Sequence, residues 1–172
     1  LFATEKGKAK YTKKYGNLHL GEYPVYSASS SKPLTHIDTF DYDGKYLTWS
    51  TNGFAGTILV IEGKFSINGD RGILVPREGR TDLDFEYMKY VIQPIFRELA
   101  KGRKGDNGED EFTKLYPSML DNVMIPVPVD QEGNVDLQAQ KEIAKRFFAV
   151  EQCRHDVIEK LDALLAQRIE LM

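Results

Sequence analysis

The C-terminal segment, residues 136–172, contains neither proline nor glycine, and no other feature limits the possible folds as strongly. It is rich in alanine, leucine, glutamine, glutamate and lysine, all of which favour helices. A helix of about 35 residues would be about 50 Å long at about 1.5 Å per residue. Such a helix extends beyond any domain that a chain of 172 residues can form. We therefore expect it to protrude.

Apolar residues form a stripe along this predicted helix, at steps of three and four residues. A second stripe widens the first towards the C-terminus. Arg154 and Arg168 interrupt the first stripe. A protruding apolar seam requires a partner helix, and we expect an antiparallel coiled coil. The predicted partner face consists of Ile143, Phe147, Val150, Val157, Ile158, Leu161, Leu164, Leu165 and Leu171.

Residues 1–135 show a different pattern. Short β-branched and aromatic runs at 23–26, 45–50, 57–61, 65–67 and 72–76 are typical of strands. We interpret residues 62–64, Glu-Gly-Lys, as a hairpin turn. The apolar spacing from Phe85 to Leu99 predicts an amphipathic helix, capped by Thr81 or Asp82. The predicted fold class is α/β in the α+β sense: a mostly β domain over 1–135 with packed helices, then the long helix over 136–172.

Composition excludes several classes of protein. No apolar run approaches the roughly 20 residues of a membrane span, so no membrane partner is expected. The single cysteine, Cys153, excludes an internal disulfide and fits a reducing compartment. The formal net charge of −3 argues mildly against nucleic acid. Local basic groups argue the other way, and the group at Lys101, Arg103 and Lys104 is predicted to contact DNA phosphates.

Two polar loops carry the chemistry that suggests recognition. One is Ser50–Gly56, with Gly53 and Gly56 permitting positive φ or close backbone approach. The other is the serine-rich stretch at 27–32. Hydroxyls, amides and aromatic rings position phosphates and read base edges, although serines are also ordinary turn formers and Tyr26 an ordinary core residue. The predicted DNA-contacting residues in these regions are Tyr26, Ser27, Ser29, Ser30, Ser31, Lys32, Thr35, His36, Thr51, Asn52 and Phe54.

Catalytic motifs are scarce in this sequence. Cys153 and His155 are two positions apart on the predicted helix and therefore face different directions. Asp43, Glu62 and Lys64 resemble the acidic D…ExK signature of Mg²⁺-dependent nucleases. That signature needs the ExK pair on one strand, whereas Gly63 is expected to break the strand here.

An ordered set of motifs resembles the specificity (S) subunits of type I restriction–modification systems. It begins with "YPVYSAS" and "FDYDGKY" and continues with "WSTNGFAG". It ends with "IPVP" at 125–128 and "QKEIA" at 140–144. The match runs from about Gly21 to the C-terminus, and the order of the motifs is more specific than any one of them.

The resemblance implies a target recognition domain over 1–135 and a conserved-region spacer and dimerisation helix over 136–172. S subunits are non-catalytic and use no cofactor. They select a DNA sequence and bring DNA methyltransferase (M) and restriction (R) subunits to it, in the cytoplasm of prokaryotes. A full S subunit has two recognition domains and two long antiparallel helices. This chain has one recognition domain and one long helix. The resemblance therefore implies that it is a half-S subunit, or one half of a full S subunit, and that it reads one half of a bipartite target. Base-reading residues differ between members and do not transfer.

Three other functions stay open from the sequence alone. The first is the specificity segment of a single-chain restriction–methylation enzyme. The second is the Mg²⁺-dependent nuclease that uses Asp43, Glu62 and Lys64. The third is an adaptor whose long helix only recruits a protein.

Overall fold

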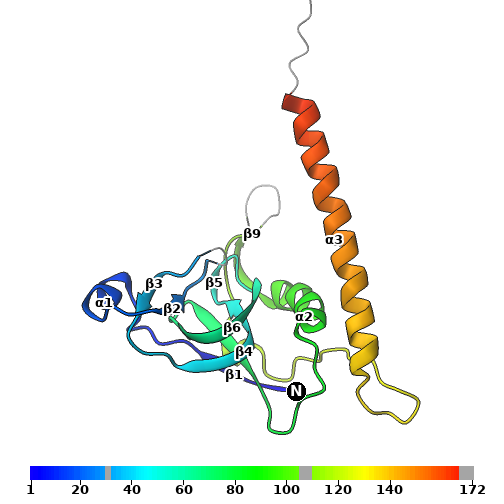
Figure 1. Cartoon of the computed structure of the whole chain (residues 1–172), viewed down its shortest axis with the longest axis horizontal. Helices are drawn as coiled ribbons and strands as arrows, with labels where there is room; N and C mark the ends of the chain where they lie inside the picture. The colour runs from blue at the N-terminus through cyan, green and yellow to red at the C-terminus, as the bar shows by residue number, and fades with distance from the viewer. Residues whose placement is uncertain (30–31, 105–109, 167–172) are drawn as a thin grey trace, which may run out of the picture.

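The computed structural model describes residues 1–29, 32–104 and 110–166 of the chain, without the side chains of Lys104, Asp110 and Glu111. A β-rich domain carries one long helix that extends away from it (Figure 1). The elements in chain order are β1 (Phe2–Lys6), α1 (Lys13–Leu18), β2 (Tyr23–Tyr26), β3 (Thr35–Ile37), β4 (Tyr42–Ser50), β5 (Asn52–Gly53), β6 (Ile58–Ile67), β7 (Arg71–Pro76), α2 (Phe85–Leu99), β8 (Lys101–Lys104), β9 (Asp110–Lys114), the 3-10 turn η1 (Pro117–Met119) and α3 (Leu137–Ala166).

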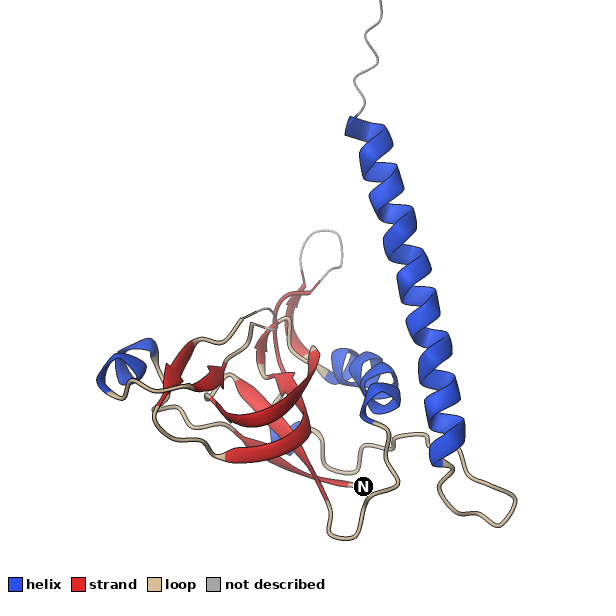
Figure 2. Ribbon diagram, viewed as in Figure 1, coloured by secondary structure: helices blue, strands red, loops and turns tan. Residues whose placement is uncertain are grey.

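Two sheets build the domain (Figure 2). The larger has six strands in the order β1-β7-β4-β6-β2-β3, and only the β2–β6 pair is parallel. The smaller is antiparallel, in the order β5-β9-β8. A single residue, Thr51, separates β4 from β5. The small sheet is therefore attached directly to the end of a central strand of the large one.

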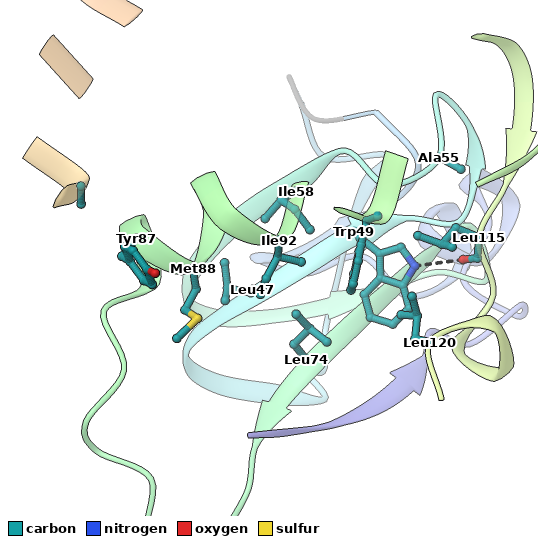
Figure 3. Close-up of a cluster of buried hydrophobic side chains, with 12 residues drawn as sticks. Leu47, Trp49, Ala55, Ile58, Leu74, Tyr87, Met88, Ile92, Leu115 and Leu120 are labelled. Atoms are coloured by element: carbon teal, nitrogen blue, oxygen red, sulfur yellow. Dashed lines mark hydrogen bonds between the residues drawn. The ribbon is translucent and has the colours of Figure 1, made fainter. Parts of the chain in front are cut away.

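Trp49 lies at the centre of the main core (Figure 3). Its indole Nε1 donates a hydrogen bond to the Leu115 carbonyl at 2.9 Å, and its ring meets the Phe96 ring edge-on, with 5.6 Å between centroids. A Cβ on Gly72 would come within 2.3 Å of the indole, so only glycine leaves room for the ring. The core thus ties α2, through Phe96, to β4 and β7 of the large sheet.

The predicted turn at 62–64 is wrong, because β6 runs without interruption from Ile58 to Ile67. Gly63 faces Gly44 across the β4–β6 pair, and both have positive φ, +99° and +132°. Two facing glycines relieve the strain locally, so the ladder continues on both sides of them. The predicted helix cap is also wrong, since the Asp84 side chain accepts from the Tyr87 N–H and caps α2.

Helix α3 is fixed to the domain at its first turns. The side chain of Gln140, which is fully buried, accepts from the Asp84 N–H and donates to the Asp82 carbonyl, both at 2.9 Å. Two turns further on, the Phe147 ring stacks on Tyr90 at 5.1 Å, and the Tyr90 hydroxyl donates to Glu151 at 2.9 Å. These contacts set the angle at which the helix leaves the domain.

Beyond these contacts the helix stands clear of the domain. Every side chain from Lys145 to Ala166 is exposed at least in part, including the apolar ones. The α+β fold and the long C-terminal helix predicted from the sequence are confirmed. Leu171 lies outside the described residues, so its place in the seam stays a prediction. Within the described part of the chain, no helix has both the length and the apolar character needed to cross a membrane.

Candidate nucleic-acid interface

The loop between β4 and β6 is closed by the Ser50 side chain. Its Oγ donates to the Phe54 carbonyl at 2.6 Å and accepts from the Thr57 N–H at 3.2 Å. Thr113 of β9 adds a second tie, because its hydroxyl donates to the Gly53 carbonyl and accepts from the Ala55 N–H. The result is a rigid turn on which the Phe54 side chain stands 67% exposed.

Gly53 and Gly56 have the positive φ angles that the sequence predicts. Gly53 has φ +76° and Gly56 has φ +84°, a region that disfavours other residues. A Cβ on Gly56 would also come within 2.8 Å of the Phe96 backbone. The loop therefore packs directly onto α2, while Gly53 stays open to the surface.

The serine-rich loop is held by a buried arginine that sequence reasoning missed. Arg71, at the start of β7, is fully buried. Its Nε donates to the Ser27 carbonyl at 2.6 Å, and its Nη2 donates to the carbonyls of Ala28 and Ser29 at 3.2 and 3.0 Å. Nη1 donates to the Thr48 hydroxyl at 3.0 Å. One planar guanidinium thus fixes three consecutive loop carbonyls to the central strand.

The charge of Arg71 persists in this setting. Burial lowers the pKa of Arg71 from 12.5 to about 10, so the guanidinium stays protonated at neutral pH. It donates hydrogen bonds to three carbonyls and a hydroxyl. A charged donor bonds such acceptors more strongly than a neutral one does. The backbone at 27–29 is therefore held firmly beside the loop that follows β4.

The two loops meet where two hollows adjoin, and we call the residues that line both hollows the ridge. The ridge consists of Ala28, Asn52 and Gly53, which line both hollows. The Arg97 hollow, about 470 Å³, is completed by Ser29, Phe54, Thr57 and Arg97. The Lys114 hollow, also about 470 Å³, is completed by Asp70, Phe112, Lys114 and Tyr116. Each hollow thus combines an exposed aromatic ring with a basic side chain.

Basic side chains surround this ridge. Arg97 and Lys114 line the hollows, and the Lys6 ammonium lies over the Tyr116 ring at 4.9 Å from its centroid. Lys101 pairs with Lys114 across β8 and β9, and both side chains are exposed, as is that of Arg103. The small sheet therefore presents positive charge next to a polar ridge, which is the arrangement that a DNA backbone requires.

The structure brings together only part of the predicted contact set. Ser29, Asn52 and Phe54 line one hollow, and Ser27 lies beside them through Arg71. Thr51 is fully buried, with its hydroxyl 3.4 Å from the Gly69 carbonyl, so we reassign it from base contact to positioning. Ser30 and Ser31 lie outside the described residues, as does the Lys104 side chain.

The remaining predicted residues line neither hollow. Thr35 and His36 belong to β3, the outermost strand of the large sheet, beside α1 (Figure 1). Thr35 packs against Gly16 of α1, His36 is exposed, and neither lines the hollows. Tyr26 meets the Phe65 ring edge-on and is half-buried. Lys32 is exposed on the loop that leads to β3.

The three residues of the nuclease signature can now be located. Because β6 is continuous, Glu62 and Lys64 do lie on one strand, and Asp43 faces Lys64 on β4. All three side chains are exposed, and the Lys64 ammonium lies over the Phe40 ring at 4.9 Å. Among the described residues, no group of three or more His, Cys, Asp or Glu side chains is arranged to hold a metal ion.

Comparison with known proteins shows which family the chain matches. The family model for the type I restriction modification DNA specificity domain matches residues 1–167. The specificity subunit of the type I restriction enzyme MpnII from Mycoplasma pneumoniae is 30% identical over 95% of this chain and 45% of its own length. Another M. pneumoniae protein classed as a type I specificity subunit is also 30% identical, over 95% of this chain and 60% of its own length.

A solved structure supports the fold. The S subunit of a type I restriction–modification system from M. genitalium superposes with a TM-score of 0.63 at 17% identity, over 95% of this chain and 40% of that protein. The chain thus spans between two fifths and three fifths of the length of these proteins.

Proposed function

This chain belongs to the type I restriction–modification DNA specificity family, and we propose that it selects the DNA sequence on which such a system acts. Its role is recognition, without catalysis. The observation that carries the proposal is the ridge of Ala28, Asn52 and Gly53, flanked by two hollows with basic side chains. Polar groups at the centre suit base edges, and cations at the rim suit phosphates.

Selection from a pool of duplex DNA with a randomised region tests this function. The full chain is expected to enrich one consensus sequence, and to bind it about a thousandfold or more tighter than random duplex at the same salt concentration. Enrichment of no consensus would overturn the proposed function.

The basic group on β8 should set the salt dependence of binding. Changing Lys101, Arg103 and Lys104 together to glutamine should reduce the slope of log K against log salt by about 0.9 for each lost phosphate contact. Affinity should fall equally on target and on random duplexes, because phosphates carry no sequence information. Fluorescence anisotropy at several salt concentrations measures both quantities.

A matched control removes three charges elsewhere. Lys13, Lys14 and Lys45 are exposed, and α1, which carries the first two, lies at the end of the domain away from β8 (Figure 1). Their triple glutamine variant should keep the slope of the unmodified chain. An equal slope for the chain with and without the β8 substitutions would show that these residues do not contact phosphates.

The long helix supports a finer proposal about assembly. Seven apolar side chains that share one face of α3 are exposed: Phe147, Val150, Val157, Ile158, Leu161, Leu164 and Leu165. An apolar surface of this kind marks an interaction site. We infer that α3 pairs antiparallel with a second copy, or with a second half of the same subunit. Methyltransferase and restriction subunits then dock on the assembly, which works on double-stranded DNA in the prokaryotic cytoplasm.

A further inference from the structure

The amide of Asn52 is held in one orientation by Asp70. Asn52 Nδ2 donates to Asp70 Oδ1 at 2.6 Å. An ionised carboxylate only accepts hydrogen bonds, so the amide nitrogen, and not the amide oxygen, must face Asp70. Exchange of the two ends of the amide would place an oxygen against a carboxylate and lose the bond.

Asp70 is itself fixed at its backbone. Its N–H donates to the Asn68 side-chain oxygen at 2.9 Å, and its carbonyl accepts from the Thr51 N–H at 2.9 Å. The second bond links it to the residue directly before Asn52. Donor and acceptor are therefore positioned relative to each other by the backbone of two neighbouring elements, β5 and the turn before β7.

The rest of the Asn52 amide is available for a ligand. One of its two N–H bonds goes to Asp70, which leaves one donor together with the amide oxygen as acceptor. Asn52 lies on the ridge and lines both hollows. Apart from the two chain neighbours of Gly53, no atom of the described residues lies within 4 Å of the position that a Cβ would take there, so the space at Gly53 is open.

A paired donor and acceptor matches one base in the major groove. Adenine presents the N7 acceptor beside the N6–H donor. Guanine presents two acceptors there, cytosine a donor, and thymine an acceptor and a methyl group. We propose that Asn52, oriented by Asp70, is a specificity-determining residue that reads an adenine in the major groove. This inference rests on the proposed function.

The charges around the ridge fit a base rather than a phosphate at this point. Asp70 lines the Lys114 hollow, and its carboxylate repels the DNA backbone from the centre of the ridge. Arg97 and Lys114 attract the backbone to the outer sides of the two hollows. The strand that presents its base to Asn52 is thus supported by cations on either side.

Two variants of the full chain test the orientation of the amide. Asp70→Asn leaves the amide free to exchange its ends, because the new partner both donates and accepts. Two orientations of similar energy halve the population of the one that suits adenine, so affinity for the adenine-containing target should fall about twofold. Affinity for random duplex should not fall, because the substitution removes a negative charge. Selection from the randomised duplex pool, followed by anisotropy on matched duplexes, measures both effects.

The exchange variant makes the prediction more specific. Asn52→Asp combined with Asp70→Asn keeps the net charge and keeps a hydrogen bond between the two positions, with its direction reversed. Residue 52 then presents only acceptors, which suit the N4 amino group of cytosine. We expect the adenine at one position of the consensus to be replaced by cytosine, while the other positions stay as they are.

The other outcomes distinguish failure of this inference from failure of the proposed function. If the unmodified chain selects a consensus and the exchange variant selects the same one, the inference is wrong and the proposed function stands. The inference also fails if the affected base is not adenine, or if Asp70→Asn weakens every position and lowers the melting temperature, since the pair would then be structural. A chain that selects no consensus overturns the proposed function and this inference together.

Discussion

Changing Arg71 to methionine should lower the free energy of unfolding by about 2–4 kcal/mol and should reduce discrimination between target and random DNA by about a hundredfold or more. Arg71 donates four hydrogen bonds from a fully buried side chain. Methionine fills similar space but donates none. An acceptor that loses its partner on burial costs about 1–3 kcal/mol, and the total stays below the sum because the loop can move towards water.

The loss of discrimination has a separate cause. The carbonyls of Ser27, Ala28 and Ser29 have a common donor in Arg71, so all three are released together. Ala28 belongs to the ridge and Ser29 to the Arg97 hollow. A ridge without a fixed backbone has no defined pattern of donors and acceptors, whereas the phosphate contacts of the small sheet remain. Random duplex should therefore bind nearly as before.

A control separates loss of stability from loss of position. Ile92 of α2 is fully buried in the main core, and Ile92→Ala should cost about 2–5 kcal/mol through the cavity it leaves. We expect that variant to keep its discrimination at a temperature where it is folded. Chemical denaturation gives the stabilities, and anisotropy on target and random duplexes gives the discrimination. If Arg71→Met discriminates as well as Ile92→Ala, Arg71 is only a core residue.

The elements that sequence analysis predicts correctly are those whose signal is local. The apolar spacing of α2 and α3 repeats every three or four residues, and no distant partner is needed to detect it. The interruption expected at Gly63 is wrong for the opposite reason. Gly44, which lies opposite Gly63 and shares its positive φ, is brought there only by the pairing of β4 with β6.

In the candidate site too, the residues predicted correctly are those whose signal is local. Asn52 and Phe54 are predicted from loop chemistry, and both line a hollow. Thr51 has similar chemistry but is buried, because it directly follows the central strand β4 and bonds across to Gly69 and Asp70. Arg71 carried no signal that sequence reasoning used, since its loop partners are 42 to 44 positions away. A charged residue at the start of an apolar strand was the available hint.

Asp70 shows why the chemistry of one residue depends on another. The turn Asn68–Asp70 is evident in the sequence as a turn signal, and nothing local indicates that its carboxylate reaches Asn52, 18 positions earlier. That contact decides which end of the Asn52 amide is available. The proposed base specificity of Asn52 therefore depends on a pair of residues that folding brings together, and the loop sequence alone does not contain it.

Changing both Leu161 and Leu164 to aspartate should convert a dimer of this chain into monomers. The two side chains are 53% and 62% exposed, and they lie on the apolar face of α3, which at that height stands clear of the described part of its own domain (Figure 1). In an antiparallel pair each of them is buried against the partner helix. Four uncompensated carboxylates in one interface should raise the dissociation constant by at least about a thousandfold. Light scattering at tens of micromolar measures the change directly.

The control places the same charge on the opposite face of the helix. Gln152 and Ala163 are exposed and lie on the side of α3 away from the seam, as expected for 3.6 residues per turn. Aspartate at both positions adds the same charge difference and should leave the dimer intact. Circular dichroism should show equal helix content in both variants, so that loss of the dimer cannot be attributed to unfolding of α3.

Loss of the dimer should weaken target binding far more than random binding, because in the proposed assembly α3 acts as a spacer. Its 30 residues span about 45 Å, more than one turn of B-DNA at about 34 Å. An antiparallel pair places two identical ridges at opposite ends, where they read a symmetric target interrupted by a fixed gap of several base pairs. A parallel pair would place both ridges at one end. If the second helix instead belongs to a second half of the same subunit, the proposed target is asymmetric. An unmodified chain that is monomeric at tens of micromolar would exclude the second copy and leave the recognition role of the ridge unaffected.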